Sequence, residues 1–212
     1  GPWGAEAGGD ASGGGECRVV WQGGWGAAGA DRAGAVERWG RAVPAPGPAG
    51  PDPGGLAAWG AGQTTEVGVT VTVAGGRPQR LGLATLDEAV EATWSDTVAD
   101  ALRDWFASDA PKVLADAKLQ VKALRRAGVR LAGLVFDPVL AGWLLRPSFP
   151  DKTLADLVGR YLDEKLPEAD PSQLVPETEG ATPGQLSWFT LRASDALRAE
   201  LPESVARVLT DI

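Results

Sequence analysis

The sequence contains no histidine, one cysteine (Cys17) and one tyrosine (Tyr161). Without histidine, the chain lacks the side chain that most often serves as a general base or a metal ligand. A single cysteine permits neither an internal disulfide nor a cysteine zinc site, which fits a reducing cytoplasm. No apolar run reaches the length of a membrane span, and no signal-peptide pattern is present at the N-terminus. We therefore expect a cytoplasmic protein without a membrane partner.

The sequence is rich in glycine, proline and acidic charge. Among 212 residues there are 29 glycines and 16 prolines, and the net charge is -8. The apolar fraction of 44% is ordinary for a globular protein, and the length allows one domain with a real core. An acidic chain is repelled by phosphate backbones, so we expect the isolated chain to bind nucleic acid weakly or not at all.

The first third of the chain is expected to be mostly irregular. Residues 1–16 are Gly-rich and are interpreted as a flexible linker or cloning remnant. Residues 17–22 contain a short apolar run that suits an edge strand, and residues 31–42 have helical spacing of apolar side chains. Residues 44–65 are rich in proline, glycine and alanine, which predicts a long loop.

From residue 66 onward the pattern predicts an α/β domain. Val67, Val69, Val71 and Val73 alternate with small or polar residues, which indicates a strand with one apolar face. Further strands are predicted at 79–84, 89–94, 112–115 and 129–136. Helices are predicted at 96–107, from 118 to a stop at Gly128, and at 138–146, 154–163 and 183–201. This order predicts a mixed β-sheet flanked by helices.

Several segments together resemble one family. Residues 112–120 read KVLADAKLQ, residues 141–147 read AGWLLRP, and residues 154–162 read LADLVGRYL. They are similar to the KVxQNLKYD, AAYLLRP and LADL…RYL segments of the 3′–5′ exonuclease domain of bacterial, actinobacterial-type DNA polymerase I, a family A polymerase. The resemblance implies an RNase H-like fold over residues 17–212. It also implies neighbouring polymerase and 5′-nuclease domains, because residues 208–212 resemble the segment that precedes the polymerase domain.

The resemblance also identifies where catalytic groups would lie. The family holds two divalent metals with an Asp-x-Glu on the first strand, the Asp that ends NLKYD, and a Tyr-x-x-x-Asp on the last helix. The matching positions here are Thr72, Gln120, Phe189 and Ala193, and none is acidic. Hard cations need anionic oxygen ligands. We therefore expect a degenerate exonuclease domain with no catalytic residue, metal or cofactor.

Three other aspartates could in principle have taken over a metal-binding role. Asp116 lies at a strand-to-helix junction, Asp137 precedes Pro138 as a helix cap would, and Asp195 is two residues beyond the lost acid. We interpret them as capping or surface residues. A basic cluster contains six residues, Lys112, Lys118, Lys122, Arg125, Arg126 and Arg130. Its possible DNA-facing members are Lys118, Lys122, Arg125 and Arg126. It is either a DNA-facing surface or a solvated helix face.

Eight of the nine tryptophans divide into two groups. Three have apolar-periodic neighbours and are predicted to lie in the core: Trp94, Trp105 and Trp143. Trp3, Trp21, Trp25, Trp39 and Trp59 either pack the N-terminal segment onto the body or contact a partner. The leading functional hypothesis is a structural spacer in a DNA polymerase without proofreading. The alternatives are an active exonuclease with relocated acids and a protein-interaction module that uses the Trp-rich N-terminal arm.

Overall fold

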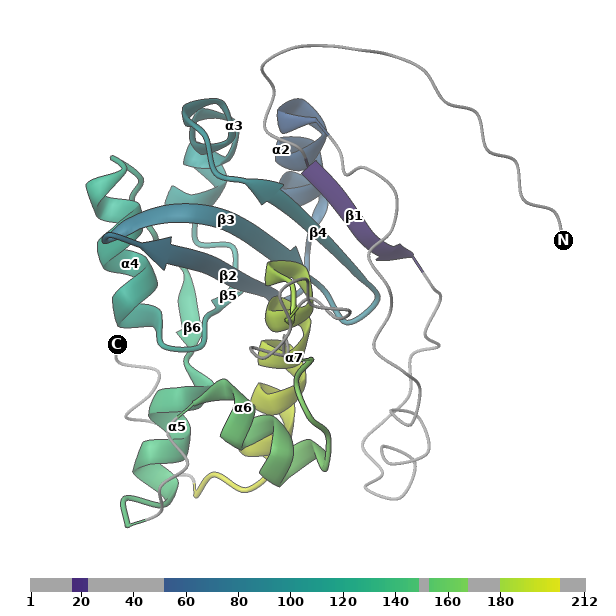
Figure 1. Cartoon of the computed structure of the whole chain (residues 1–212), viewed down its shortest axis with the longest axis vertical. Coiled ribbons are helices and arrows are strands. Elements are labelled where there is room, and N and C mark those ends of the chain that lie inside the picture. Colours follow the sequence, from purple (N-terminus) through teal and green to yellow (C-terminus); the bar gives the residue numbers. More distant parts are fainter. Residues whose placement is uncertain (1–16, 23–51, 149–152, 168–179, 203–212) are drawn as a thin grey trace, which may run out of the picture.

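The computed structural model describes residues 17–22, 52–148, 153–167 and 180–202. Within these residues, six strands form one mixed sheet in the order β1-β4-β3-β2-β5-β6 (Figure 1). The strands are β1 (Cys17–Gln22), β2 (Val67–Ala74), β3 (Arg77–Ala84), β4 (Glu88–Thr93), β5 (Lys112–Val113) and β6 (Leu134–Phe136). The helices are α2 (Pro53–Gly62), α3 (Asp96–Ala107), α4 (Ala117–Arg126), α5 (Pro138–Leu145), α6 (Leu154–Leu157), the π-helix η1 (Val158–Leu162) and α7 (Pro183–Arg198). The predicted α/β fold is confirmed.

The sheet combines antiparallel and parallel pairing. β2, β3 and β4 form an antiparallel meander, and β1 pairs with β4 at one edge as the sequence predicted. β5 and β6 then continue the sheet in parallel with β2. The connections to β5 and β6 run through helices α3 and α4, as parallel pairing requires.

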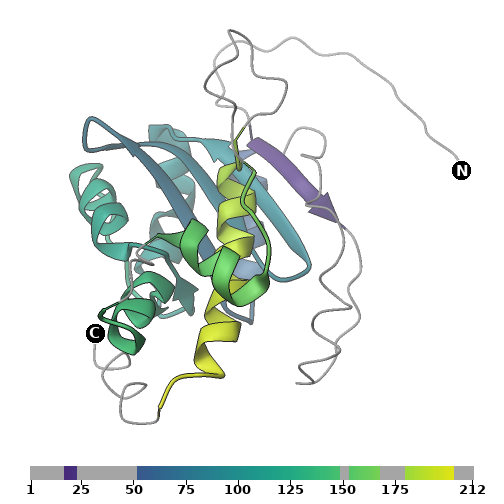
Figure 2. The same cartoon turned by 60° about the horizontal axis from the view of Figure 1, so that its bottom comes forward.

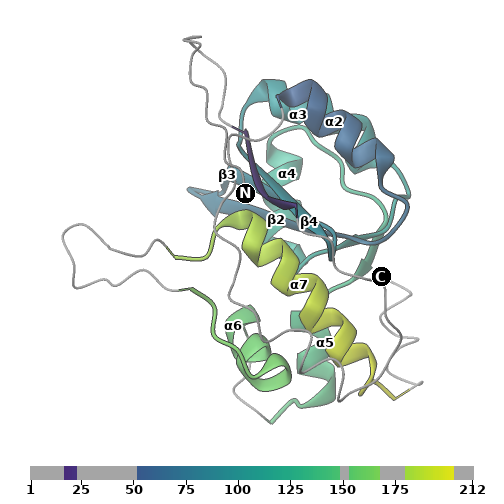
Figure 3. The same ribbon diagram turned by 90° about the vertical axis from the view of Figure 1, so that its right-hand side faces the viewer.

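Helices cover both faces of this sheet. Figure 3 shows α2, α3 and α4 on one side and α7, α6 and α5 on the other. The alternation predicted for β2 produces this arrangement, because Val67, Val69 and Val71 are buried in the cluster that also contains Leu102 and Phe106 of α3. Gly68, which lies between two of these valines, faces α7 on the other side of the sheet.

Helix α7 lies directly on the sheet backbone (Figure 2). A Cβ atom placed on Gly82 would lie 2.1 Å from the carbonyl carbon of Pro183, and one on Gly68 would lie 2.2 Å from the carbonyl oxygen of Ser187. The Ser187 hydroxyl donates a hydrogen bond of 2.9 Å to the carbonyl of Gly82. The two glycines therefore permit a close approach that any side chain at these positions would prevent.

Charged side chains also anchor α7. The buried carboxylate of Glu91 accepts a hydrogen bond of 3.2 Å from the backbone N–H of Gly184, at the start of the helix, and one from Arg80. The last turn is held by paired hydrogen bonds from Arg198 to Glu66, with distances of 2.7 and 3.0 Å. An acid near the first turn and a cation in the last turn both suit the helix dipole. These side-chain contacts thus hold both ends of α7.

A third anchor binds the middle of α7 to the loop after η1. Arg192 is 3% exposed and forms a bidentate pair with Glu164, in which one nitrogen–oxygen distance is 3.0 Å. Its guanidinium also lies 4.5 Å from the ring centre of Trp188. Bidentate pairing and aromatic stacking make arginine suitable for such a buried position.

Local signals for the helix boundaries are mostly confirmed. Ser95 accepts a hydrogen bond from the N–H of Val98 at the start of α3, and Thr182 forms the expected capping box with Gln185 at the start of α7. Gly128 has the positive φ of 73° expected just beyond the end of α4. Sequence spacing therefore located most of the helices to within a few residues.

Two predictions about the elements were wrong. The loop predicted at 44–65 contains α2, which Asp52 caps through a 2.7 Å hydrogen bond from Gly55 and which begins with Pro53 at a position that tolerates proline. Gly60 of α2 faces the ring of Trp105, so tertiary packing outweighs its low helix propensity. The strand predicted at 129–136 is restricted to β6. The predicted linker at 1–16, the predicted helix at 31–42 and residues 44–51 lie outside the described residues.

Candidate functional site

Thr72, at the position of the family's first-strand acid, has a structural role in β2. The register between β2 and β3 shifts between Thr72 and Val73, which marks a bulge. The Thr72 hydroxyl accepts a 3.0 Å hydrogen bond from the backbone N–H of Arg80 across this irregularity. The Thr72 side chain therefore accepts a backbone hydrogen bond from β3 at the point where the regular pairing of β2 and β3 is interrupted.

Gln120 has a comparable role between α4 and the sheet. Its side chain is buried, and its carboxamide oxygen accepts a 2.7 Å hydrogen bond from the backbone N–H of Val71. Its amide nitrogen donates a 2.6 Å hydrogen bond to the carbonyl of Ala115. An amide can satisfy a donor and an acceptor together, whereas a carboxylate can only accept. Glutamine is thus suited to this place in a way that an ionised acid is not.

Phe189 and Ala193 face apolar surroundings on α7. Both are fully buried. Phe189 packs in a cluster with Ala84, Ala89 and Val158, and its ring makes an edge contact with Trp188 at 5.1 Å. Ala193 belongs to a second cluster, with Val113, Phe136, Ala141, Leu157, Leu191 and Leu197. The structure thus places Gln120 next to β2, one residue from Thr72, but it directs Phe189 and Ala193 into two separate parts of the core.

The remaining acids form no metal site in the part of the chain that is described. Among those residues, no group of three or more Asp, Glu, Cys or His side chains is arranged to hold a metal ion. Asp116 and Asp195 are exposed, and Asp195 pairs with Arg198 at 3.6 Å. Tyr161 packs against the cluster that contains Ala193.

Asp137 joins the starts of two helices. Its carboxylate accepts hydrogen bonds from the N–H groups of Val139 and Leu140 in α5, at 2.9 and 3.2 Å. It also accepts from Asp116 and Ala117 at the start of α4, at 3.2 and 2.9 Å. Burial raises the pKa of Asp137 above its ordinary value, while the four donors act in the opposite direction. This structure supports the interpretation of Asp137 as a cap and extends it to α4.

Replacing Asp137 with alanine is expected to lower the free energy of unfolding by about 2 kcal/mol, because it removes the caps of two helices. Urea unfolding followed by circular dichroism measures this change. The matched control is Asp116→Asn. Asp116 has a φ of 53° and makes no capping hydrogen bond with its side chain, and asparagine tolerates that backbone conformation. An equal loss of stability in both variants would contradict the capping role of Asp137.

The basic cluster predicted on α4 is only partly a surface. Lys112 is fully buried, and its ammonium group donates hydrogen bonds to the carbonyls of Ser108 and Ala110, at 3.0 and 2.8 Å. Burial lowers the pKa of Lys112 to about 8, although Asp109 acts to raise it. Including Lys112 in the cluster was wrong, because its side chain is enclosed in the interior, where its ammonium nitrogen lies 4.6 Å from the ring centre of Trp105.

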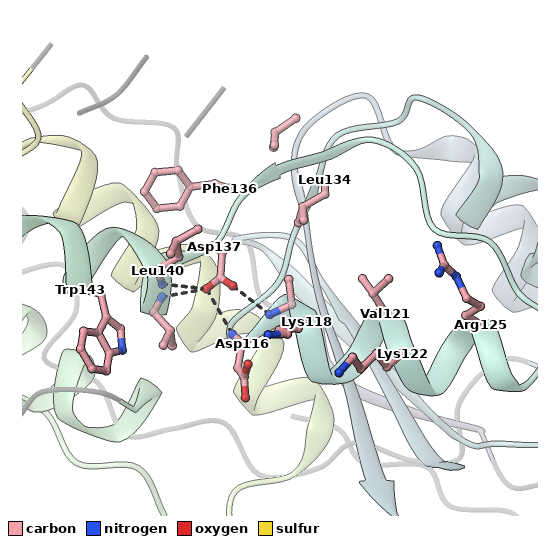
Figure 4. Close-up of a pocket in the computed structure, with 13 residues that line it drawn as sticks. Asp116, Lys118, Val121, Lys122, Arg125, Leu134, Phe136, Asp137, Leu140 and Trp143 are labelled. Carbon is pink, nitrogen blue, oxygen red and sulfur yellow. Dashed lines mark hydrogen bonds between the residues drawn. The ribbon is translucent and has the colours of Figure 1, made fainter. Parts of the chain in front are cut away.

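The other members of the cluster are exposed and face different directions. Arg126 donates a 3.3 Å hydrogen bond to the carbonyl of Gly76 in the β2–β3 turn. Lys118, Lys122 and Arg125 instead line a hollow of about 500 Å³ between α4, β6 and α5. Figure 4 shows Trp143 towards one end of this hollow and Arg125 towards the other, with Asp137 between the two helix starts.

We call this hollow the α4–α5 groove. Its walls are completed mainly by apolar side chains: Val121, Leu134, Val135, Phe136, Val139, Leu140 and Trp143. Trp143 is 41% exposed, so its prediction as a core residue was wrong. Trp105 is buried as predicted, whereas Trp94 is only partly buried. Trp59 packs on the main core and donates to Glu88, which ties α2 to the body.

Several important residues had not been identified from the sequence. Glu66, Glu91, Glu164 and Arg192 anchor α7, although none belongs to a recognisable motif. One signal was available for Glu91, because a charged residue interrupts an otherwise apolar run in β4. The groove had no such signal, since it depends on how α4 and α5 diverge around the edge strand.

The strand order, with helices on both faces and α7 across the sheet, defines an RNase H-like α/β domain. Residues 81–170 match the family model described as the DNA polymerase I, ribonuclease H-like domain. The chain is 43% identical over 75 residues to DNA polymerase I of Mycobacterium leprae and 38% identical over 111 residues to that of Mycobacterium bovis. These matches cover 35% and 48% of this chain, but only 8% and 12% of the two relatives.

Solved structures give the same result. One similar structure is the POL domain of Pol1 from M. smegmatis in complex with DNA primer-template and dNTP. Its comparison with this chain gives a TM-score of 0.60 and a sequence identity of 28%. The match covers 76% of this chain and 28% of that chain. A nuclease in its apo form, 17% identical with a TM-score of 0.51, supports the fold alone; the match covers 72% of this chain and 83% of that one. The chain is thus similar in sequence and in fold to the ribonuclease H-like, 3′–5′ exonuclease-like domain of DNA polymerase I.

Proposed function

We propose that this domain is catalytically inactive and acts as a structural spacer within a DNA polymerase I. The observation that carries the proposal is the chemistry at the four positions that match the family's catalytic residues. Thr72 and Gln120 are engaged in hydrogen bonds to the backbone, and Phe189 and Ala193 are enclosed by apolar side chains. None of these groups can replace an anionic metal ligand. A fold can persist without its activity because catalysis depends on a site and not on the scaffold.

The anchoring of α7 supports the same proposal. In a two-metal nuclease, ions would bridge acids on the sheet and on the last helix. In this chain Glu66, Glu91 and Glu164 connect α7 to the sheet and to the loop after η1 through arginines and a backbone N–H. These contacts can hold the helix without the help of an ion, which supports the proposed role as a spacer.

The parent protein and its partners form a further part of the proposal. The chain spans about a tenth of the length of the polymerases it matches. We expect the parent to be a cytoplasmic DNA-directed DNA polymerase without proofreading, with polymerase and 5′-nuclease domains next to this one. DNA would be bound through those domains, because the net charge of this chain is -8. No helix among the described residues is long and apolar enough to cross a membrane.

Millimolar magnesium or manganese is expected to leave the melting temperature unchanged, to within about 1 °C. A ligand that binds only the native state raises the melting temperature by mass action, and this site has no anionic ligands to bind an ion. Differential scanning calorimetry with each ion, and then with a chelator, makes the measurement. A rise of several degrees that the chelator reverses would reveal a surviving metal site and would contradict the proposal.

A further inference from the structure

The α4–α5 groove carries a row of cations along one wall. Lys118, Lys122 and Arg125 line it from α4, and their spacing of four and three residues places them on one face of that helix (Figure 4). All three side chains are exposed, and none forms an ion pair with another residue in the described part of the chain. The row extends about 10 Å along the helix, so it presents three unpaired positive charges to whatever enters the groove.

The remainder of the groove is mainly apolar. Val121 of α4, Leu134 of β6 and Val139 of α5 are only half-buried, and Leu140 of α5 is 36% exposed. Contact between apolar surface and water costs free energy that a binding partner would recover. Apolar side chains that gather in a hollow and are bordered by charge are typical of interaction sites.

The chemistry of the groove favours a polypeptide over a nucleic acid. Single-stranded nucleic acids are bound by cations that follow the backbone and by several aromatic rings on which successive bases stack. The lining contains only two aromatic residues, Trp143 and Phe136, and Phe136 is buried. Asp116 adds an exposed carboxylate that would repel phosphate. An apolar floor beside a row of cations instead suits a helix with one apolar face and acids along its border.

The described residues of a second copy of this chain do not supply such a helix. An exposed acidic row lies on α3, at Asp96, Asp100 and Asp104. Arg103 lies on the same helix and pairs with Asp100, and none of the exposed large apolar side chains of the described residues belongs to α3. The charge of α3 would match the cations of the groove, but its surface would leave the apolar floor uncovered. The partner that fits is therefore a different polypeptide.

We propose that the α4–α5 groove binds an acidic amphipathic helix of another protein. The apolar face of that helix would cover Val121 and Leu140. Its acids, three or four residues apart, would lie opposite the cations of α4 and would fix the direction in which the helix docks. This inference does not depend on whether the domain is catalytic.

Fluorescence anisotropy with a synthetic peptide tests the proposal on the full chain. The probe is a fluorescein-labelled helix of about 18 residues, or about 27 Å, with leucine on one face and glutamate beside it. The control peptide has the same composition in scrambled order, which removes the apolar face but keeps the charge. The chain is expected to bind the probe at least about tenfold more tightly than the scrambled peptide. No binding, or equal affinity for the two peptides, would overturn the proposal.

Charge-reversal variants locate the binding on the cationic wall. Lys122→Glu/Arg125→Glu is expected to weaken binding of the probe by about tenfold or more. The matched control, Arg77→Glu/Arg130→Glu, makes the same change in net charge at two exposed arginines that do not line the groove. It is expected to change the affinity by less than about twofold. An equal loss in both variants would show that net charge alone attracts the peptide, and would overturn the proposal.

A second pair of variants tests the apolar floor. Leu140→Asp places a charge inside the groove and is expected to weaken binding of the probe by about tenfold. Leu119→Asp adds the same charge to α4 at a leucine that is 52% exposed and does not line the groove, and it should leave the affinity near that of the wild type. Urea unfolding midpoints confirm that both variants are folded. Equal affinities of the two variants would overturn the proposal.

Two further measurements test the other occupants. The chain alone is expected to sediment as a monomer at all concentrations, and a fluorescein-labelled oligothymidylate is expected not to compete with the probe. Self-association that Lys122→Glu/Arg125→Glu abolishes would assign the groove to a second copy of the chain. Competition by the oligonucleotide that the same variant abolishes would assign the groove to a nucleic acid. Either result would overturn the proposal.

Discussion

Replacing Gly82 with alanine is expected to lower the free energy of unfolding by about 3 kcal/mol, the upper end of ordinary overpacking. The added Cβ atom would lie 2.1 Å from the carbonyl carbon and 2.2 Å from the carbonyl oxygen of Pro183. Both are backbone atoms at the start of α7, so no side chain can rotate away to make room. The helix would have to move off the sheet, which would also stretch the contact between Gly184 and Glu91.

Chemical denaturation of Gly82→Ala against wild type measures this loss. Gly62→Ala is the matched control, because a Cβ atom on Gly62 would meet nothing within 4 Å. Gly62 lies at the end of α2, where alanine is the better helix former, so the control should be neutral or slightly stabilising. If Gly82→Ala unfolded at the wild-type denaturant concentration, the close contact between α7 and β3 would be wrong.

Replacing Ala193 with aspartate is expected to lower the free energy of unfolding by about 4 kcal/mol. Metal ions are not expected to restore the lost stability. The position is fully buried among Val113, Phe136 and Leu197, where a carboxylate would have no partner. An unpaired buried charge is among the few changes that produce effects of this size.

The pH dependence of this variant separates charge from volume. In Ala193→Asp the introduced carboxyl would have a folded-state pKa above its unfolded value, so the penalty is absent at low pH and grows as the pH rises between the two values. Ala193→Asn adds a similar volume without a charge. The difference in stability between these variants should therefore shrink when urea unfolding is repeated near pH 4. A constant difference, or recovery with manganese at neutral pH, would contradict the burial of Ala193.

Much of this fold was predictable because local signals agreed with the tertiary structure. The alternating valines of β2 are buried on one face, and the capping box at Thr182 begins α7. α2 was missed because its glycines and Pro53 resemble a loop until Trp105 and the rest of the core are present to pack against it. Propensity is a weak guide wherever tertiary contacts decide the outcome.

The candidate site was predictable only in its chemistry. The sequence identified which residues replace the family's acids, but it could not show that Gln120 bridges α4 and β2 or that Phe189 and Ala193 enter different clusters. Lys112 was expected at the surface and Trp143 in the core, but the structure buries the lysine and exposes the tryptophan. The sequence could not show this, because it depends on the tertiary contacts around each side chain. The lysine enters the interior where carbonyl oxygens can accept its hydrogen bonds, and the tryptophan borders the α4–α5 groove.

The most direct test of the account is a nuclease assay on the purified chain. Single-stranded DNA labelled at its 5′ end is incubated with the protein and magnesium or manganese, and shortening from the 3′ end is followed by gel electrophoresis. We predict no shortening above the rate in buffer, for the wild type and equally for Asp116→Ala and Asp195→Ala. Stepwise shortening that persists through repurification and disappears in either variant would show that relocated acids hold a working metal site, and that the domain is an active exonuclease.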